Sequence, residues 1–195
     1  MIFRHSLTDL LKVKDLADIR PWNVLSSCYL RKNVRVDQCE FPNGKVFEAV
    51  VLEYGTWVTI LALTKDQQVV LIRQYRHGVR DVIVELPGGV MDKEDANPLA
   101  AARRELLEET GYSSDKIVEI GRVSPNPANQ TNLIYSFLAL DAEKVGQQAL
   151  DDTEEIEVFL RPLEEVIAMG RNGELLQSMQ VATLFFALAH LGRIG

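Results

Sequence analysis

The sequence is poor in cysteine and contains no long apolar run. Its two cysteines among 195 residues, Cys28 and Cys39, are too few for a disulfide scaffold or a four-cysteine zinc site. The strongly apolar runs 58–63 and 184–189 are far shorter than the roughly 20 residues that a membrane-spanning helix needs. No basic stretch followed by an apolar one opens the chain, so no secretory signal is expected. We therefore expect a cytoplasmic protein with no membrane partner.

Basic residues are also in deficit, with 21 lysines and arginines against 28 acidic residues and a net charge of −7. A nucleic-acid-binding surface usually needs a basic face that displaces counterions, so no nucleic-acid partner is expected. The apolar content of 47% is ordinary for a globular protein and can support a substantial core. An acidic protein still binds an anionic substrate when a divalent cation lies between them.

The predicted elements form a mixed α/β domain behind an N-terminal β section. The segment 8–20 is expected to be a short helix or irregular lead that Pro21 ends. The expected strands are 29–40, 46–54, 57–64, 68–75, 82–86, 117–123, 133–140 and 157–161, and the expected helices are 98–110, 163–169 and 179–191.

The helix 98–110 carries the strongest functional signal. Asn97 is its expected N-cap, Pro98 its first residue and Gly111 its C-terminal stop. At about 100° per residue, the three glutamates 105, 108 and 109 fall within roughly 100° of one helix face. Such a face is either a solvated charged surface or a divalent-cation site. The glycine pair 88–89, which follows a strand and precedes the helix, favours the cation site because bare backbone approaches a ligand closely.

Gly89 and the segment 104–112 (Arg-Glu-Leu-Leu-Glu-Glu-Thr-Gly-Tyr) resemble the Nudix box, Gly-x5-Glu-x7-Arg-Glu-U-x-Glu-Glu-x-Gly-U with U apolar. The right half matches fully. The left half is one residue longer, which places the first glutamate of the box at Asp95 or Ala96. In the family this glutamate supports the loop and the box arginine, and Asp95 or Glu94 is expected to replace it.

Segments outside the box are similar to the ADP-ribose pyrophosphatase branch, whose members hydrolyse nucleoside diphosphate sugars. They are 71–77 (Leu-Ile-Arg-Gln-Tyr-Arg-His), 85–89 (Glu-Leu-Pro-Gly-Gly) and Pro127, fifteen residues past the box. The resemblance implies an α/β/α sandwich with a mixed β-sheet. It divides the chain into an N-terminal lead and β section, 1–55, which homodimers of the branch exchange, and a catalytic domain, 56–195.

The implied activity is a Mg²⁺- or Mn²⁺-dependent hydrolysis of ADP-ribose or a related nucleoside diphosphate sugar to a nucleoside monophosphate and a sugar phosphate. GDP-mannose and ADP-glucose are alternative substrates. A non-catalytic nucleotide-sugar sensor with the same fold is an alternative of another class, and a plain α/β domain with a solvated helix face is a third.

The family pattern implies a metal site on the helix. Glu105 and Glu109 are the expected principal ligands, together with the backbone carbonyl of Gly88. Glu108 is expected to be a third ligand and to take part in catalysis. The general base is often an acid in the loop before the last strand. Glu154 is the first candidate there, followed by Asp152 or Glu155, while a solvated acidic loop is the alternative.

Four residues are expected to bind substrate. Arg76 matches a branch position that contacts substrate, and Arg73 lies on the same strand. An ion pair that holds a dimer together is an equally good interpretation of these two arginines. Trp57 is a candidate to stack on the base, although aromatic residues in strands are usually core. Asn126 lies in a polar loop that either faces the terminal sugar or is simply surface.

Overall fold

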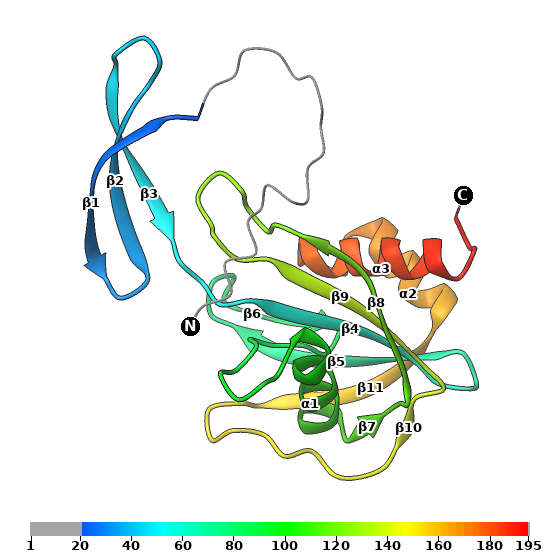
Figure 1. Ribbon diagram of the computed structural model, residues 1–195. Helices are drawn as coiled ribbons and strands as arrows, with labels where there is room; N and C mark the ends of the chain where they lie inside the picture. Colours follow the sequence, from blue (N-terminus) through cyan, green and yellow to red (C-terminus); the bar gives the residue numbers. More distant parts are fainter. Residues whose placement is uncertain (1–20, 195) are drawn as a thin grey trace. The chain divides into compact units, whose positions relative to one another are not determined.

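The computed structural model describes residues 21–194, which fall into two compact units, one ending at Val51 and one beginning at Leu52 (Figure 1). The lead expected over 8–20 lies outside the described residues. The domain boundary between residues 55 and 56 stays a prediction. Within the described part of the chain, no helix has the length and apolar character needed to cross a membrane.

The N-terminal unit is a three-stranded sheet with the order β1-β2-β3. Its strands are β1 (Asn23–Arg31), β2 (Val34–Glu40) and β3 (Val46–Leu52). The single strand expected over 29–40 is wrong, because the turn at Lys32 and Asn33 splits it and asparagine favours tight turns.

The second unit is built on a mixed sheet of six strands, with the order β11-β5-β4-β9-β8 and with β6 paired to β5. The strands β4 and β9 run parallel and in register, and the other pairs are antiparallel. These strands are β4 (Trp57–Leu63), β5 (Gln68–Arg76), β6 (Asp81–Glu85), β8 (Lys116–Val123), β9 (Ile134–Leu140) and β11 (Ile156–Pro162). A separate ribbon pairs β7 (Tyr112–Ser113) with β10 (Glu143–Lys144), and the sequence did not predict it.

Helices cover both faces of the sheet in Figure 1: α1 (Pro98–Thr110) packs on one, and α2 (Leu163–Asn172) and α3 (Ser178–His190) lie over the other. Strand alternation divides the core between the two faces. On β4, Ile60 packs toward α1, while Leu61 packs toward α2 and α3. Both faces are therefore apolar, which explains the near-continuous apolar sequence of β4 and β5. The expected α/β/α sandwich is confirmed.

Candidate active site

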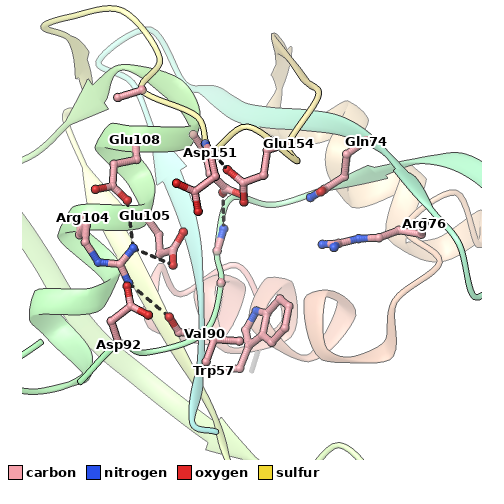
Figure 2. A pocket seen from close by; sticks show the side chains of 14 residues that line it. Trp57, Gln74, Arg76, Val90, Asp92, Arg104, Glu105, Glu108, Asp151 and Glu154 are labelled. Carbon is pink, nitrogen blue, oxygen red and sulfur yellow. Dashed lines mark hydrogen bonds and ion pairs between the residues drawn. The ribbon is translucent and has the colours of Figure 1, made fainter. Parts of the chain in front are cut away.

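A polar cavity of about 250 Å³ lies where the segment after β6, one face of α1 and the loop before β11 meet (Figure 2). Six acidic and two arginine side chains line it, so acidic groups outnumber basic ones in the cavity. The lining residues are Trp57, Gln74, Arg76, Gly88, Gly89, Val90, Asp92, Arg104, Glu105, Glu108, Glu109, Ala149, Asp151 and Glu154.

The helix α1 supplies three of these acids and begins and ends as the sequence predicts. The side chain of Asn97 caps it by accepting a hydrogen bond from the backbone N–H of Ala100 at 3.0 Å. Gly111 ends it with a φ of 71°, and its N–H donates to the carbonyl of Leu107 at 2.8 Å. Pro98 stands in the first turn, where its missing N–H costs nothing.

The glycine pair lets the backbone approach both β4 and α1. A Cβ on Gly88, whose φ is +154°, would lie 2.2 Å from the carbonyl oxygen of Val58. The N–H of Gly88 donates to Oε2 of Glu109 at 2.7 Å. The flanking carbonyls of Pro87 and Gly89 accept from β4, whereas the Gly88 carbonyl accepts no hydrogen bond from any residue in 21–194. It is therefore available to a ligand.

Burial raises the pKa values of two of the helix acids. The pKa of Glu105 rises to about 7 and that of Glu109 to about 8, because burial penalises the charged carboxylate and because the other acids of the cavity repel it. Arg104 opposes the shift at Glu105, and the Gly88 N–H opposes it at Glu109. These two carboxylates would gain most from a nearby positive charge.

Arg104 joins the loop before α1 to the acids of the helix. It donates to both oxygens of Asp95, at 3.2 and 2.9 Å, and to Glu108 at 2.9 Å. It also lies 3.0 Å from Glu105. Asp95 in turn accepts from the N–H of Asp92 at 2.9 Å, and its contact with Arg104 lowers the pKa of its carboxyl group. Asp95 thus contacts the box arginine despite the extra residue in the loop.

The loop before β11 is tied to the end of α1 by hydrogen bonds. The N–H of Ala149 donates to the carbonyl of Glu108 at 2.9 Å. The side-chain amide of Gln148 donates to the carbonyls of Glu109, at 2.7 Å, and Ile156, at 3.0 Å. These bonds hold the loop so that Asp151 and Glu154 line the cavity across from the helix acids (Figure 2). Asp152 and Glu155 do not line it.

The expected substrate-binding residues separate into two groups. Trp57 and Arg76 line the cavity, whereas Arg73 and Asn126 do not. Alternation along β5 turns Arg73 to the opposite face, where it bonds Glu157 at 3.1 Å and lies over the ring of Phe159. Asn126 belongs to a turn: its backbone carbonyl accepts from Gln130 and its side chain from Ala128.

The donor set fits a hard divalent cation. Carboxylate oxygens and a backbone carbonyl are the ligands that Mg²⁺ and Mn²⁺ prefer. In the arrangement described, Arg104 holds Glu105 and Glu108, and no three histidine, cysteine or acidic side chains of residues 21–194 surround a single point at ligand distance. Binding an ion would therefore require side chains of this set to move.

The NUDIX domain model matches residues 54–179, well over half of the chain. The protein belongs to the Nudix family. It is 30% identical over 141 residues to the ADP-ribose pyrophosphatase of Bacillus subtilis, a match that covers 72% of this chain and 76% of that protein. It is 31% identical over 161 residues to the GDP-mannose pyrophosphatase of Salmonella arizonae, covering 76% and 83% respectively.

The fold of a solved structure described as an ADP compounds hydrolase also matches this Nudix protein. The TM-score is 0.78, and the match covers 91% of this chain and 99% of the other, at 21% sequence identity. At this identity the likeness supports the fold. The resemblance stated from the sequence is confirmed by the family match.

Sequence reasoning missed several residues that line the cavity of this Nudix fold. Gln74 carried a usable signal, since it lies two positions from Arg76 on one strand and must therefore share its face. Asp151 and Asp92 carried no such signal, because loop residues have no fixed periodicity. Arg104 belongs to the box, and the structure places it on the cavity wall.

Proposed function

We propose that this Nudix protein is a divalent-cation-dependent pyrophosphatase that splits the diphosphate linkage of ADP-ribose or a related nucleoside diphosphate sugar. The products are a nucleoside monophosphate and a sugar phosphate. One observation carries the proposal: acids from α1 and from the loop before β11 meet at a single cavity, beside an unused backbone carbonyl and an arginine. The names of the two relatives make GDP-mannose the second candidate substrate.

Glu105, Glu109 and Glu108 would hold Mg²⁺ or Mn²⁺ together with the carbonyl of Gly88. A bound cation supplies charge neutralisation at the diphosphate, which the acidic cavity would otherwise repel. The protein's part is to place these oxygens. Gly88 fixes Glu109 by its N–H, and Arg104 fixes Glu105 and Glu108.

Glu154 is our candidate for the general base. One of its carboxylate oxygens accepts from the N–H of Asp151 at 3.2 Å, which fixes the carboxylate in the loop facing α1. In the proposed reaction, the oxygen of a water adds to one phosphorus and the bond from that phosphorus to the bridging oxygen breaks. Glu154 takes the proton of the water, and the second phosphate departs with the bridging oxygen.

Arg76 and Trp57 would bind the substrate on the other side of the cavity. The guanidinium of Arg76 suits phosphate oxygens, because its N–H groups form a planar fork. Trp57 stands at the start of β4 beside Val90 and offers a flat apolar surface to a base or a sugar.

The proposed activity is tested by incubating the protein with Mg²⁺ and a panel of nucleotide sugars that includes ADP-ribose, GDP-mannose and ADP-glucose. We expect a nucleoside monophosphate to form from at least one of them, and the release to be lost in Glu109→Gln. A wild-type protein that binds Mg²⁺ and releases nothing from any substrate would contradict the enzyme and favour the sensor.

We further propose a homodimer that forms through the N-terminal unit. Large apolar side chains on β1 and β3 are at least half exposed there, among them Val24, Leu30 and Val46. Light scattering tests this, and Leu30→Lys should shift the mass toward that of a monomer. The cytoplasmic location and the absence of nucleic-acid and membrane partners stay predictions from the sequence.

A further inference from the structure

Glu85, the last residue of β6, is a buried carboxylate that no step above uses. It is 0% exposed, and its hydrogen-bond donors are two residues of the neighbouring strand β5. Arg76 donates through Nε to Oε1 at 3.1 Å and through Nη2 to Oε2 at 2.7 Å. Gln74 donates through Nε2 to Oε2 at 2.8 Å. Both donors line the cavity, so this buried acid lies directly behind two residues of the site.

The burial of Glu85 favours a role other than stability. Removing a charge from water is costly, and a buried ion pair often contributes no more to folding than apolar side chains of the same volume. The same strand offers a comparison on its other face, where Arg73 pairs with Glu157, a residue that is 63% exposed. The pair of Arg73 and Glu157 therefore loses little hydration, whereas Glu85 is fully desolvated in its pair with Arg76 at the edge of the cavity.

Glu85 determines which part of Arg76 faces the cavity. A guanidinium has five N–H groups, and the bonds to Glu85 use the one on Nε and one on Nη2. The remaining N–H groups lie on the outer edge of the fork. The side chain of Arg76 is 30% exposed and points into the cavity (Figure 2). Because Glu85 already fixes the guanidinium of Arg76, its free N–H groups can bind a phosphate with little further loss of side-chain rotamer freedom.

Glu85 also determines the orientation of the Gln74 amide. Nε2 of Gln74 donates to Oε2 of Glu85, so the NH₂ group of Gln74 faces Glu85. Its carbonyl oxygen is thereby left for the other side and can accept from a hydroxyl group of a ligand. Gln74 and Arg76 thus form an acceptor and a donor on one strand face, both fixed by a single buried acid.

We propose that Glu85 is a positioning residue that holds Arg76 and Gln74 as a preformed subsite for a phosphate and an adjacent hydroxyl group. This deepens the proposed function and rests on it for the identity of the substrate. We expect Glu85 to act through binding, because the two residues that it holds, Gln74 and Arg76, lie across the cavity from Glu105 and Glu108 (Figure 2).

The test compares Glu85→Gln with Glu157→Gln, which removes the charge and one acceptor oxygen from the partner of Arg73 on the opposite face of β5. In the Glu85 variant we expect KM for the hydrolysed nucleotide sugar to rise about tenfold or more, with kcat within about threefold. Mg²⁺ affinity, measured by calorimetry, should be unchanged. Glu157→Gln should keep both kinetic constants, because Arg73 lies outside the cavity.

A folded Glu85→Gln enzyme with native KM would overturn the proposal, whether or not its kcat falls. Glu85→Asp keeps the charge and retracts it by one methylene, so its KM should lie between those of wild type and Glu85→Gln. If the glutamine variant does not fold, a native KM in Glu85→Asp overturns the proposal instead.

Binding of ADP in the presence of Mg²⁺ separates this proposal from the proposed function. A wild-type protein that hydrolyses no nucleotide sugar contradicts the pyrophosphatase. The positioning role still predicts that Glu85→Gln weakens ADP binding about tenfold, while Glu157→Gln leaves it unchanged. Equal ADP affinity in wild type and Glu85→Gln would contradict the positioning role whatever the activity.

Discussion

The carboxyl group of Glu105 fills the space that a side chain on Gly89 would occupy: a Cβ placed there would lie 2.5 Å from Oε1 of Glu105. The neighbouring Gly88 is restricted by something different, since its Cβ would meet the backbone of β4 at Val58 and Thr59. A flexible side chain can move away, whereas a strand in the middle of a sheet cannot. Gly89 therefore leaves space for a side chain of the site, whereas Gly88, which also contributes its N–H and carbonyl to the site, is the glycine that the fold itself requires.

We predict that Gly89→Ala and Gly88→Ala fail in different ways. Gly89→Ala should fold with nearly native thermal stability but bind Mg²⁺ about tenfold more weakly or worse, because Glu105 is displaced. Gly88→Ala should lower the free energy of unfolding by about 2 kcal/mol or more, through backbone overlap and strain at positive φ. Thermal unfolding and calorimetry of both variants check this. A Gly89→Ala protein with native Mg²⁺ affinity would contradict the prediction.

The second prediction concerns the acid that supports Arg104. Asp95→Asn should lower the free energy of unfolding by about 1–2 kcal/mol, since it weakens charge-assisted hydrogen bonds to a partly exposed arginine. It should also reduce turnover, because Arg104 then holds Glu105 and Glu108 less firmly. Glu94→Gln is the matched control, one residue away and exposed. Equal losses in the two variants would show that Asp95 has no special part.

The third prediction is a pH dependence of the metal-free protein. The pKa values of Glu105 and Glu109 are about 7 and about 8, above the ordinary value of 4.5 that applies to the unfolded chain. Between about pH 4.5 and 8 the folded state therefore binds more protons, and the free energy of unfolding falls as the pH rises. Chelated protein should unfold at a lower temperature at pH 8 than at pH 6, and Mg²⁺ should restore stability at pH 8.

Replacing Glu109 isolates its part of that effect. Glu109→Gln removes the titrating group, so the melting temperature of the chelated variant should fall less between pH 6 and 8 than that of wild type. Glu119→Gln, at an exposed site on β8, should behave as wild type. A Glu109 variant with the wild-type pH dependence would rule out this residue as the source.

The sequence predicted α1 well because its signals are local. The cap at Asn97, the stop at Gly111 and the common face of Glu105, Glu108 and Glu109 all follow from contacts within five residues along the chain. The strand β5 was harder. Alternation puts Arg73 and Arg76 on opposite faces, but both faces of the strand are covered, so the apolar pattern did not tell which arginine faces the cavity.

The path of the loop before β11 could not be predicted from the sequence, for a different physical reason. Its path depends on hydrogen bonds from Gln148 and Ala149 to the carbonyls of α1, some 40 residues earlier in the chain. Four acids among the five residues 151–155 give no periodicity from which to tell which of them faces inward. Asp152 was therefore predicted for the site, while its neighbour Asp151 lines the cavity.

The last prediction distinguishes the acids of this loop by their roles. Glu154→Gln should lower kcat by about 10²–10⁴, the usual contribution of a general base, while Mg²⁺ binding persists because the ligands on α1 are intact. Asp152→Asn should keep kcat, since Asp152 does not line the cavity. Asp151→Asn is the decisive comparison, because Asp151 faces the same space as Glu154 (Figure 2). If the kcat of Asp151→Asn falls steeply while Glu154→Gln stays active, Asp151 is the base. The hydrogen bond from the N–H of Asp151 to the carboxylate of Glu154 then holds Glu154 away from the attacking water.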